Sequence, residues 1–137
     1  MINTTTSIRV RYAETDPMRY VYYGNYATYF EVARVDLFRS LGISYDEIEK
    51  RGFFLPVSEY HINYIKPALY DQVLTLKTSI KTKPGIRIIF DYEIYNEANE
   101  KITEATTTLF FLRAEDHKII KCPDFLMTLI DANWTEN

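Results

Sequence analysis

Asp16 lies near the start of the stretch of this sequence that could best support chemistry. The segment ETDPMRYVYYGNYATYFEVAR, residues 14–34, places Asp16 ahead of an aromatic loop that leads into an apolar segment of helical period. Apolar neighbours would leave the carboxylate partly dry, so it could act as a nucleophile or a general base. These neighbours are Tyr20, Val21, Tyr22, Tyr23 and Tyr26. The alternative is that Asp16 only forms a turn with Pro17.

The peptide backbone where the loop meets the helix is the second candidate group. Gly24 lets the chain approach a ligand closely, and the free N–H groups around Tyr23, Gly24 and Asn25 point out of the positive end of the helix. Such groups form an oxyanion hole in acyl-transfer enzymes. The alternative is that Gly24 relieves a tight turn and Asn25 caps the helix.

Metal and disulfide chemistry have little support in the sequence. The chain has one cysteine, Cys122, which cannot form an internal disulfide, and two well-separated histidines, His61 and His117. We expect no metal site, no cofactor, and a small semi-buried role for Cys122.

Composition narrows the class of protein. The 137 residues are 47% hydrophobic and 15% aromatic, which fits one compact domain covering residues 1–137. A net charge of -3 gives no basic surface for nucleic acid. The sequence contains no bilayer-spanning apolar run and its start does not resemble a signal peptide, so we expect a cytoplasmic protein.

The elements that must position Asp16 follow from hydrophobic periodicity. Residues 7–13 alternate as a half-buried strand, and residues 25–41 predict a long helix that stops at Gly42. Ser44 and Glu47 have capping-box spacing, which predicts a short helix ending near residue 51.

The rest of the chain predicts sheet. Four segments rich in β-branched and aromatic residues are separated by turn signals, at residues 53–69, 71–83, 86–96 and 101–115. A closing helical turn with Pro123 at its first position follows. We therefore predict an α+β fold, an antiparallel five-stranded sheet wrapped around one long helix. One helix covers one face, so apolar sheet surface and strand edges would require a second subunit, giving a dimer or a tetramer.

The segments TDPMRYVYYGNYATYFEVARVDLF and YIKPALYDQVLTLKTSI together resemble the hotdog-fold acyl-CoA thioesterases of the 4-hydroxybenzoyl-CoA thioesterase type. The resemblance covers nearly the whole chain. It implies that Asp16 is the catalytic carboxylate and that the backbone N–H at Tyr23 polarises the thioester carbonyl. Many relatives carry histidine where this chain has Tyr23, so only the backbone contribution is expected here. Gly24 should leave the loop flexible, and Tyr22, Gly24 and Asn25 are expected to contact substrate.

Two further sets of charged residues could take part in catalysis or in substrate binding. Other hotdog thioesterases place their carboxylate on the helix, where this chain has Glu31, but an i, i+3 ion pair with Arg34 is the plainer interpretation. Coenzyme A phosphates need cations, and Lys81, Lys83 and Arg87 at a strand-to-strand turn are candidates. They could equally be ordinary solvated charges.

The function expected on these grounds is hydrolysis of a thioester, carried by coenzyme A or a carrier protein, to a free acid and a thiol. The alternative is a non-catalytic acyl-CoA-binding hotdog protein, which would not need Asp16. The acyl group preference stays open at this stage.

Overall fold

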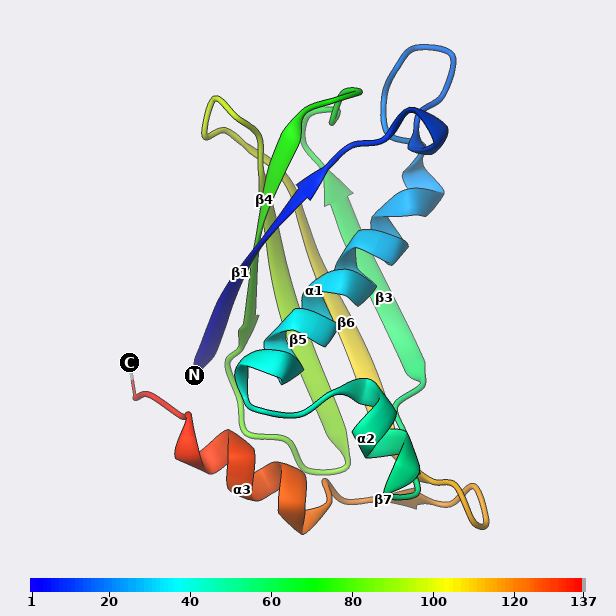
Figure 1. Ribbon diagram of the computed structural model, residues 1–137, viewed down its shortest axis with the longest axis vertical. Coiled ribbons are helices and arrows are strands. Elements are labelled where there is room, and N and C mark those ends of the chain that lie inside the picture. Colours follow the sequence, from blue (N-terminus) through cyan, green and yellow to red (C-terminus); the bar gives the residue numbers. More distant parts are fainter. Residues whose placement is uncertain (137) are drawn as a thin grey trace.

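The computed structural model describes residues 1–136 and shows an antiparallel sheet with one long helix lying across a single face (Figure 1). The elements in chain order are β1 (Ile2–Arg9), α1 (Tyr26–Ser40), α2 (Tyr45–Lys50), β2 (Phe53–Phe54), β3 (Val57–Tyr64), β4 (Val73–Ile80), β5 (Arg87–Tyr95), β6 (Lys101–Arg113), β7 (Ile119–Ile120) and α3 (Asp124–Ala132). The predicted hotdog architecture is confirmed.

The sheet has seven strands, where five were predicted. The long strands lie in the order β3-β6-β5-β4-β1, and all of their pairings are antiparallel. The additional strands β2 and β7 have two residues each and pair with the end of β6. The structure divides the predicted segment 53–69 into β2 and β3. Strand β7 lies outside the predicted segments, because two residues are too few to show an alternation of apolar and polar residues.

Helix α1 buries a broad apolar face against the sheet. Its 15 residues include buried positions at three- and four-residue spacing. These are Tyr26, Tyr29, Phe30, Ala33, Arg34, Leu37 and Phe38. The helix ends before Gly42, whose φ of 96° lies in the left-handed region that favours glycine. Helix and stop therefore lie where periodicity predicted them.

Strand β1 begins earlier than predicted. It covers Ile2–Arg9 rather than residues 7–13, because its threonines are β-branched and suit a strand although they give no apolar alternation. Residues Tyr12–Glu14 form a 3-10 turn instead, with Tyr12 largely exposed. The strand therefore ends well before Asp16 and leaves a longer loop.

The two smaller helices follow the predicted signals with differences. The Ser44 side chain accepts a hydrogen bond from the Glu47 N–H at 3.1 Å, which confirms the cap of α2. The Glu47 carboxylate bonds Arg51 at 2.9 Å instead of reaching back to the cap. Pro123 is the N-cap residue of α3, which is a nine-residue helix rather than a single turn.

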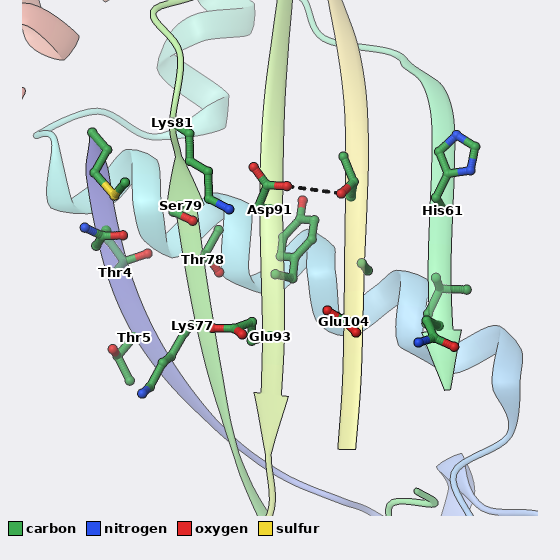
Figure 2. A pocket seen from close by; sticks show the side chains of 17 residues that line it. Thr4, Thr5, His61, Lys77, Thr78, Ser79, Lys81, Asp91, Glu93 and Glu104 are labelled. Atoms are coloured by element: carbon green, nitrogen blue, oxygen red, sulfur yellow. Dashed lines mark hydrogen bonds between the residues drawn. The ribbon is translucent and has the colours of Figure 1, made fainter. Parts of the chain in front are cut away.

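The sheet face turned away from α1 is polar, in contrast to the apolar surface expected. Figure 2 shows this face with α1 behind the sheet and Lys77, Asp91, Glu93 and Glu104 standing on it. Residues of this outer face line a groove with a volume of about 610 Å³.

Strand β3 lies at one edge of the sheet. It pairs on one side only, with β6, and its side chains are exposed along most of its length. Strand β1, which pairs only with β4, forms the other edge of the long-stranded sheet.

None of the helices within residues 1–136 is long and apolar enough to cross a membrane.

Candidate active site

Asp16 forms a turn and at the same time faces a groove. Its Oδ1 accepts hydrogen bonds from the N–H groups of Met18 at 2.9 Å and Tyr20 at 3.2 Å. The Asp16 N–H donates to the Tyr20 carbonyl at 2.8 Å. The turn interpretation is therefore correct for Oδ1. No hydrogen bond from residues 1–136 reaches Oδ2, and the two interpretations of Asp16 are compatible because different oxygens serve them.

The loop that carries Asp16 is held against the segment after β3. The Val21 N–H donates to the Ala68 carbonyl at 2.8 Å, and the Tyr70 N–H donates to the Arg19 carbonyl at 3.0 Å. Arg19 itself has a φ of 66°, a left-handed conformation uncommon outside glycine. These bonds tie the loop to the segment that follows β3.

Asp16 and the beginning of α1 line one groove of about 600 Å³. The other lining residues are Pro17, Tyr20, Val21, Tyr22, Tyr23, Tyr26, Tyr64, Ile65, Lys66 and Pro67. The Tyr26 and Tyr64 rings pack edge to face with centroids 5.1 Å apart, and the Tyr64 hydroxyl donates to the Tyr23 carbonyl at 3.4 Å. The wall is thus largely aromatic, as expected from the loop sequence.

Residues 64–67 are the part of this wall to which the sequence analysis gave no role. They follow β3 and are about 40 residues distant in the chain from the Asp16 loop; the hydrogen bond from Tyr64 to Tyr23 spans 41 positions. A local sequence pattern carries no signal for such a contact. The segment YIKPAL marks a strand end and a turn, and only the strand order brings it beside α1.

A 3-10 turn at Tyr23–Asn25 leads directly into α1. The N–H groups of Tyr23 and Gly24 are the first of this helical segment, so no preceding turn supplies acceptors for them. Both residues lie at the groove or next to it, and the positive end of the helix dipole adds to their attraction for an anion. The geometry can therefore bind a developing oxyanion.

Gly24 and Asn25 do not play the alternative roles considered for them. Gly24 has no positive φ, and a Cβ there would lie 2.8 Å from Cε2 of Tyr22, so glycine leaves room for that ring. Asn25 makes no side-chain capping bond; its Nδ2 donates instead to the Glu14 carbonyl at 2.8 Å. Asn25 is the N-cap residue of α1 by position, but its side chain turns to the loop and does not cap the helix.

Burial raises the pKa of two tyrosines of the groove, Tyr26 and Tyr64. Removal from water raises the pKa of Tyr26, although hydrogen bonds to the Ala68 backbone and Thr103 oppose this. Burial likewise raises the pKa of Tyr64. Both phenols stay neutral at neutral pH and can serve as walls and hydrogen-bond donors, but not as bases.

The three cations assigned to coenzyme A phosphates lie at the other end of the sheet from Asp16. Strand β4 begins at Val73, beside Arg9, and ends at Ile80, beside Ile2, which separates its ends by about 25 Å. Lys81 lines the polar outer face, Lys83 pairs with Asp131 at 3.0 Å, and Arg87 lies over the Phe110 ring. Within one chain they are not part of the Asp16 groove.

Glu31 and Arg34 do not form the expected ion pair. Glu31 is exposed on α1, whereas Arg34 is buried and its Nη1 donates to the Tyr92 hydroxyl at 3.1 Å. The two side chains leave the helix in different directions because only Arg34 enters the core. Glu31 lies outside the Asp16 groove.

Burial determines the chemistry of Cys122. Cys122 is buried, and desolvation raises the pKa of its thiol to about 12, so it carries no reactive thiolate. Within residues 1–136 no group of three or more His, Cys, Asp or Glu side chains could hold a metal ion.

Comparison with known proteins relates this geometry to a family. Residues 10–130 match the model of the thioesterase-like superfamily. The chain belongs to that superfamily. The thioesterase is 39% identical over 114 residues to YneP of Bacillus subtilis (strain 168), which carries the provisional name acyl-CoA thioesterase; the match covers 83% of each chain. It is 29% identical to the acyl-CoA thioester hydrolase YbgC of Escherichia coli O6:H1, over 76% of this chain and 80% of that one.

Solved structures agree with the sequence relatives. A DHNA-CoA thioesterase from Staphylococcus aureus superposes with a TM-score of 0.84 at 41% identity, covering 88% of this chain and 81% of that one. The protein is a thioester hydrolase of the acyl-CoA thioesterase type. The alternative of a non-catalytic binding protein is set aside.

Proposed function

We propose that this thioesterase hydrolyses its acyl-CoA substrate in the groove at the start of α1. Asp16 Oδ2 is the reacting carboxylate oxygen, and the N–H groups of Tyr23 and Gly24 hold the carbonyl oxygen. One observation carries the proposal: a carboxylate with one tethered and one free oxygen lines the same aromatic groove as the N-terminus of α1.

The reaction follows from the chemistry of these two groups. The thioester carbonyl accepts hydrogen bonds from the helix N–H groups, which favour the tetrahedral oxyanion more strongly than the neutral carbonyl. As nucleophile, Asp16 Oδ2 forms a mixed anhydride and expels the thiolate, which takes up a proton; water then cleaves the anhydride to the acid and free Asp16. As general base, Asp16 takes a proton from the water that attacks the carbonyl carbon.

We favour the nucleophile, because the apolar groove keeps bulk water scarce near the carbonyl. A single turnover in ¹⁸O-water with enzyme in excess separates the two roles. Label entering the Asp16 carboxylate indicates the covalent route. Label found only in the product acid would favour direct attack by water.

The acyl group proposed is a flat aromatic one. The groove wall includes Tyr20, Tyr22, Tyr23, Tyr26 and Tyr64, and rings prefer offset or edge-to-face contact with other rings. The likeness to the DHNA-CoA thioesterase supports the same choice. A panel of aromatic and aliphatic thioesters, on coenzyme A and on a carrier protein, should give the highest kcat/KM for aromatic acyl-CoA; a preference for long aliphatic chains would overturn this part.

The functional unit proposed is a homodimer or homotetramer with the groove at a subunit interface. Tyr60 and Tyr64 on the exposed edge of β3 are both more than a third exposed, beside the open side of α1. A second copy would cover them and close the groove. Lys81, Lys83 and Arg87 remain candidates for the coenzyme A phosphates only if another subunit presents them.

The proposal is tested by Asp16→Asn, assayed for thiol release with a thiol-reactive dye. The amide oxygen can take the place of Oδ1 and keep the turn, so folding should be retained. We expect kcat to fall by at least about 10²–10⁴, the worth of general-base help. A thioether analogue should bind with unchanged affinity, and turnover retained at the wild-type rate would overturn the site.

A further inference from the structure

Glu14 is a buried acid that the proposed chemistry does not use. It is 8% exposed, and its carboxylate accepts four hydrogen bonds. Oε1 accepts from the Arg11 N–H at 2.8 Å and from the Tyr29 hydroxyl at 2.9 Å, while Oε2 accepts from the Arg11 guanidinium at 3.2 and 3.0 Å. Tyr29 belongs to α1, so the carboxylate joins the loop before Asp16 to the helix.

The main chain of Glu14 makes a second connection. Its carbonyl oxygen accepts from the Tyr22 N–H at 2.9 Å and from the Asn25 Nδ2 at 2.8 Å. Tyr22 and Asn25 flank Tyr23 and Gly24, the two residues whose N–H groups are proposed to hold the carbonyl oxygen. Thus one residue contacts both sides of the proposed oxyanion hole and also the first turns of α1.

Glu14 also lies two positions before Asp16, and the turn that fixes Asp16 Oδ1 begins directly after it. The hydrogen bonds of Glu14 connect the segment just before Asp16 to the start of α1. The fold could hold α1 on the sheet without them, because the core contacts of Phe30, Leu37 and Phe38 do that.

We propose that Glu14 is a positioning residue that sets the distance between the Asp16 carboxylate and the Tyr23 and Gly24 N–H groups. This rests on the proposed function of those groups. Glu14 touches neither substrate nor the reacting atoms; it acts through the Asp16 loop and the helix start. A misplacement of about 1 Å between such groups costs up to about 10² in rate.

Two isosteric variants break the connection from opposite ends. Tyr29→Phe removes the hydroxyl that donates to the carboxylate, and Asn25→Asp removes the Nδ2 donor and places an oxygen against the Glu14 carbonyl. We expect kcat to fall about 10-fold in Tyr29→Phe and about 10²-fold in Asn25→Asp, with KM and the Kd of a thioether analogue within about threefold of wild type.

Tyr92→Phe is the matched control. Tyr92 is as buried as Tyr29, and its hydroxyl also bonds a buried charged side chain, Arg34, but it faces the core away from the groove. We expect Tyr29→Phe and Tyr92→Phe to lower Tm by similar amounts, and only Tyr29→Phe to lower kcat. A purely structural role for Glu14 would give equal Tm losses and wild-type kcat in both.

The experiment distinguishes an error in the positioning role of Glu14 from an error in the catalytic role of Asp16. Asp16→Asn is assayed alongside as the reference for an inactive site. If it is inactive while Tyr29→Phe and Asn25→Asp keep wild-type kcat, the site stands and the positioning role is wrong. If Asp16→Asn turns over normally, the proposed function itself fails. A kcat loss in Tyr29→Phe and Asn25→Asp with Tyr92→Phe unaffected supports Glu14.

Discussion

Replacement of Tyr23 by proline removes one N–H from the start of α1 with little disturbance of the backbone. Tyr23 is the first residue of the 3-10 turn, a position where proline is well tolerated because its N–H has no helical partner. The preceding residue, Tyr22, already has φ -60° and ψ 132°, the extended conformation that a following proline requires. The variant therefore tests the donor rather than the fold.

The magnitude follows from the number of donors lost. Tyr23→Pro deletes one of the two N–H groups assigned to the oxyanion, and loss of one such donor costs about 10²–10³ in kcat, or about 2.7–4 kcal/mol. Tyr23→Phe keeps the N–H and the ring and loses only an exposed phenol, so its kcat should stay within about twofold of wild type. Tyr23→Ala controls for the ring that proline also removes.

The assay is thiol release over a range of acyl-CoA concentrations, which gives kcat and KM separately, with circular dichroism to confirm that each variant is folded. Tyr23→Ala should fall between the other two, with its loss mainly in KM. If Tyr23→Phe were as impaired as Tyr23→Pro, the phenol would be the chemical group. If Tyr23→Pro kept wild-type kcat, the N–H would have no part in catalysis.

Three further predictions follow from burial and charge. Burial alone would raise the pKa of Glu14, but hydrogen bonds from the Arg11 N–H, the Tyr29 hydroxyl and the Arg11 guanidinium outweigh it and hold the pKa below its usual value. A carboxyl group with a lowered pKa stabilises the fold at pH values above its unfolded pKa of about 4.3, and this contribution is lost as pH falls through the folded pKa. Glu14→Gln should therefore lower the free energy of unfolding, measured by urea unfolding, by about 1–3 kcal/mol at pH 7 and by much less in acid below the folded pKa. Cys122 should react with a thiol-reactive dye at neutral pH only after unfolding, and fast labelling of native protein would contradict its burial. Tyr60→Glu on the β3 edge should shift light scattering at micromolar concentration from a dimer or tetramer toward monomer and lower activity in parallel, whereas a fully active monomer would exclude a shared site.

Local patterns predicted the parts of this protein that local forces determine. The period of α1, its stop at Gly42 and the Ser44 cap are set by residues within a few positions of one another, and all three are confirmed. The predicted position of strand β1 was wrong, because its threonines favour a strand but give no alternation of apolar and polar residues that would show where the strand begins.

The sequence pattern could indicate only the part of the candidate groove that lies close together in the chain. Asp16, Tyr22 and Tyr23 fall within eight positions and line one groove, and their catalytic roles stay a prediction. The wall from Tyr64 onward and the bonds from Asn25 to Glu14 depend on the strand order and on the loop path, which no periodicity encodes.

The distance of Lys81, Lys83 and Arg87 from the groove within one chain has a similar cause. Lys81 lies on a turn of suitable charge, but β4 runs away from the Asp16 loop, so its far turn is distant from the groove in the same chain. The sequence shows which turns carry charge, and only topology shows which end of the sheet each turn occupies.

The most direct test of the account is infrared spectroscopy of Asp16→Asn mixed in excess with an acyl-CoA that carries ¹³C at the thioester carbonyl. One spectrum follows both the bound carbonyl and the carboxylate of any product acid. We predict a carbonyl band shifted below its frequency in water, because the N–H groups at the start of α1 polarise it, and no acid band over many wild-type turnover times. An acid band growing at the wild-type rate, or a carbonyl at its solution frequency, would contradict the account.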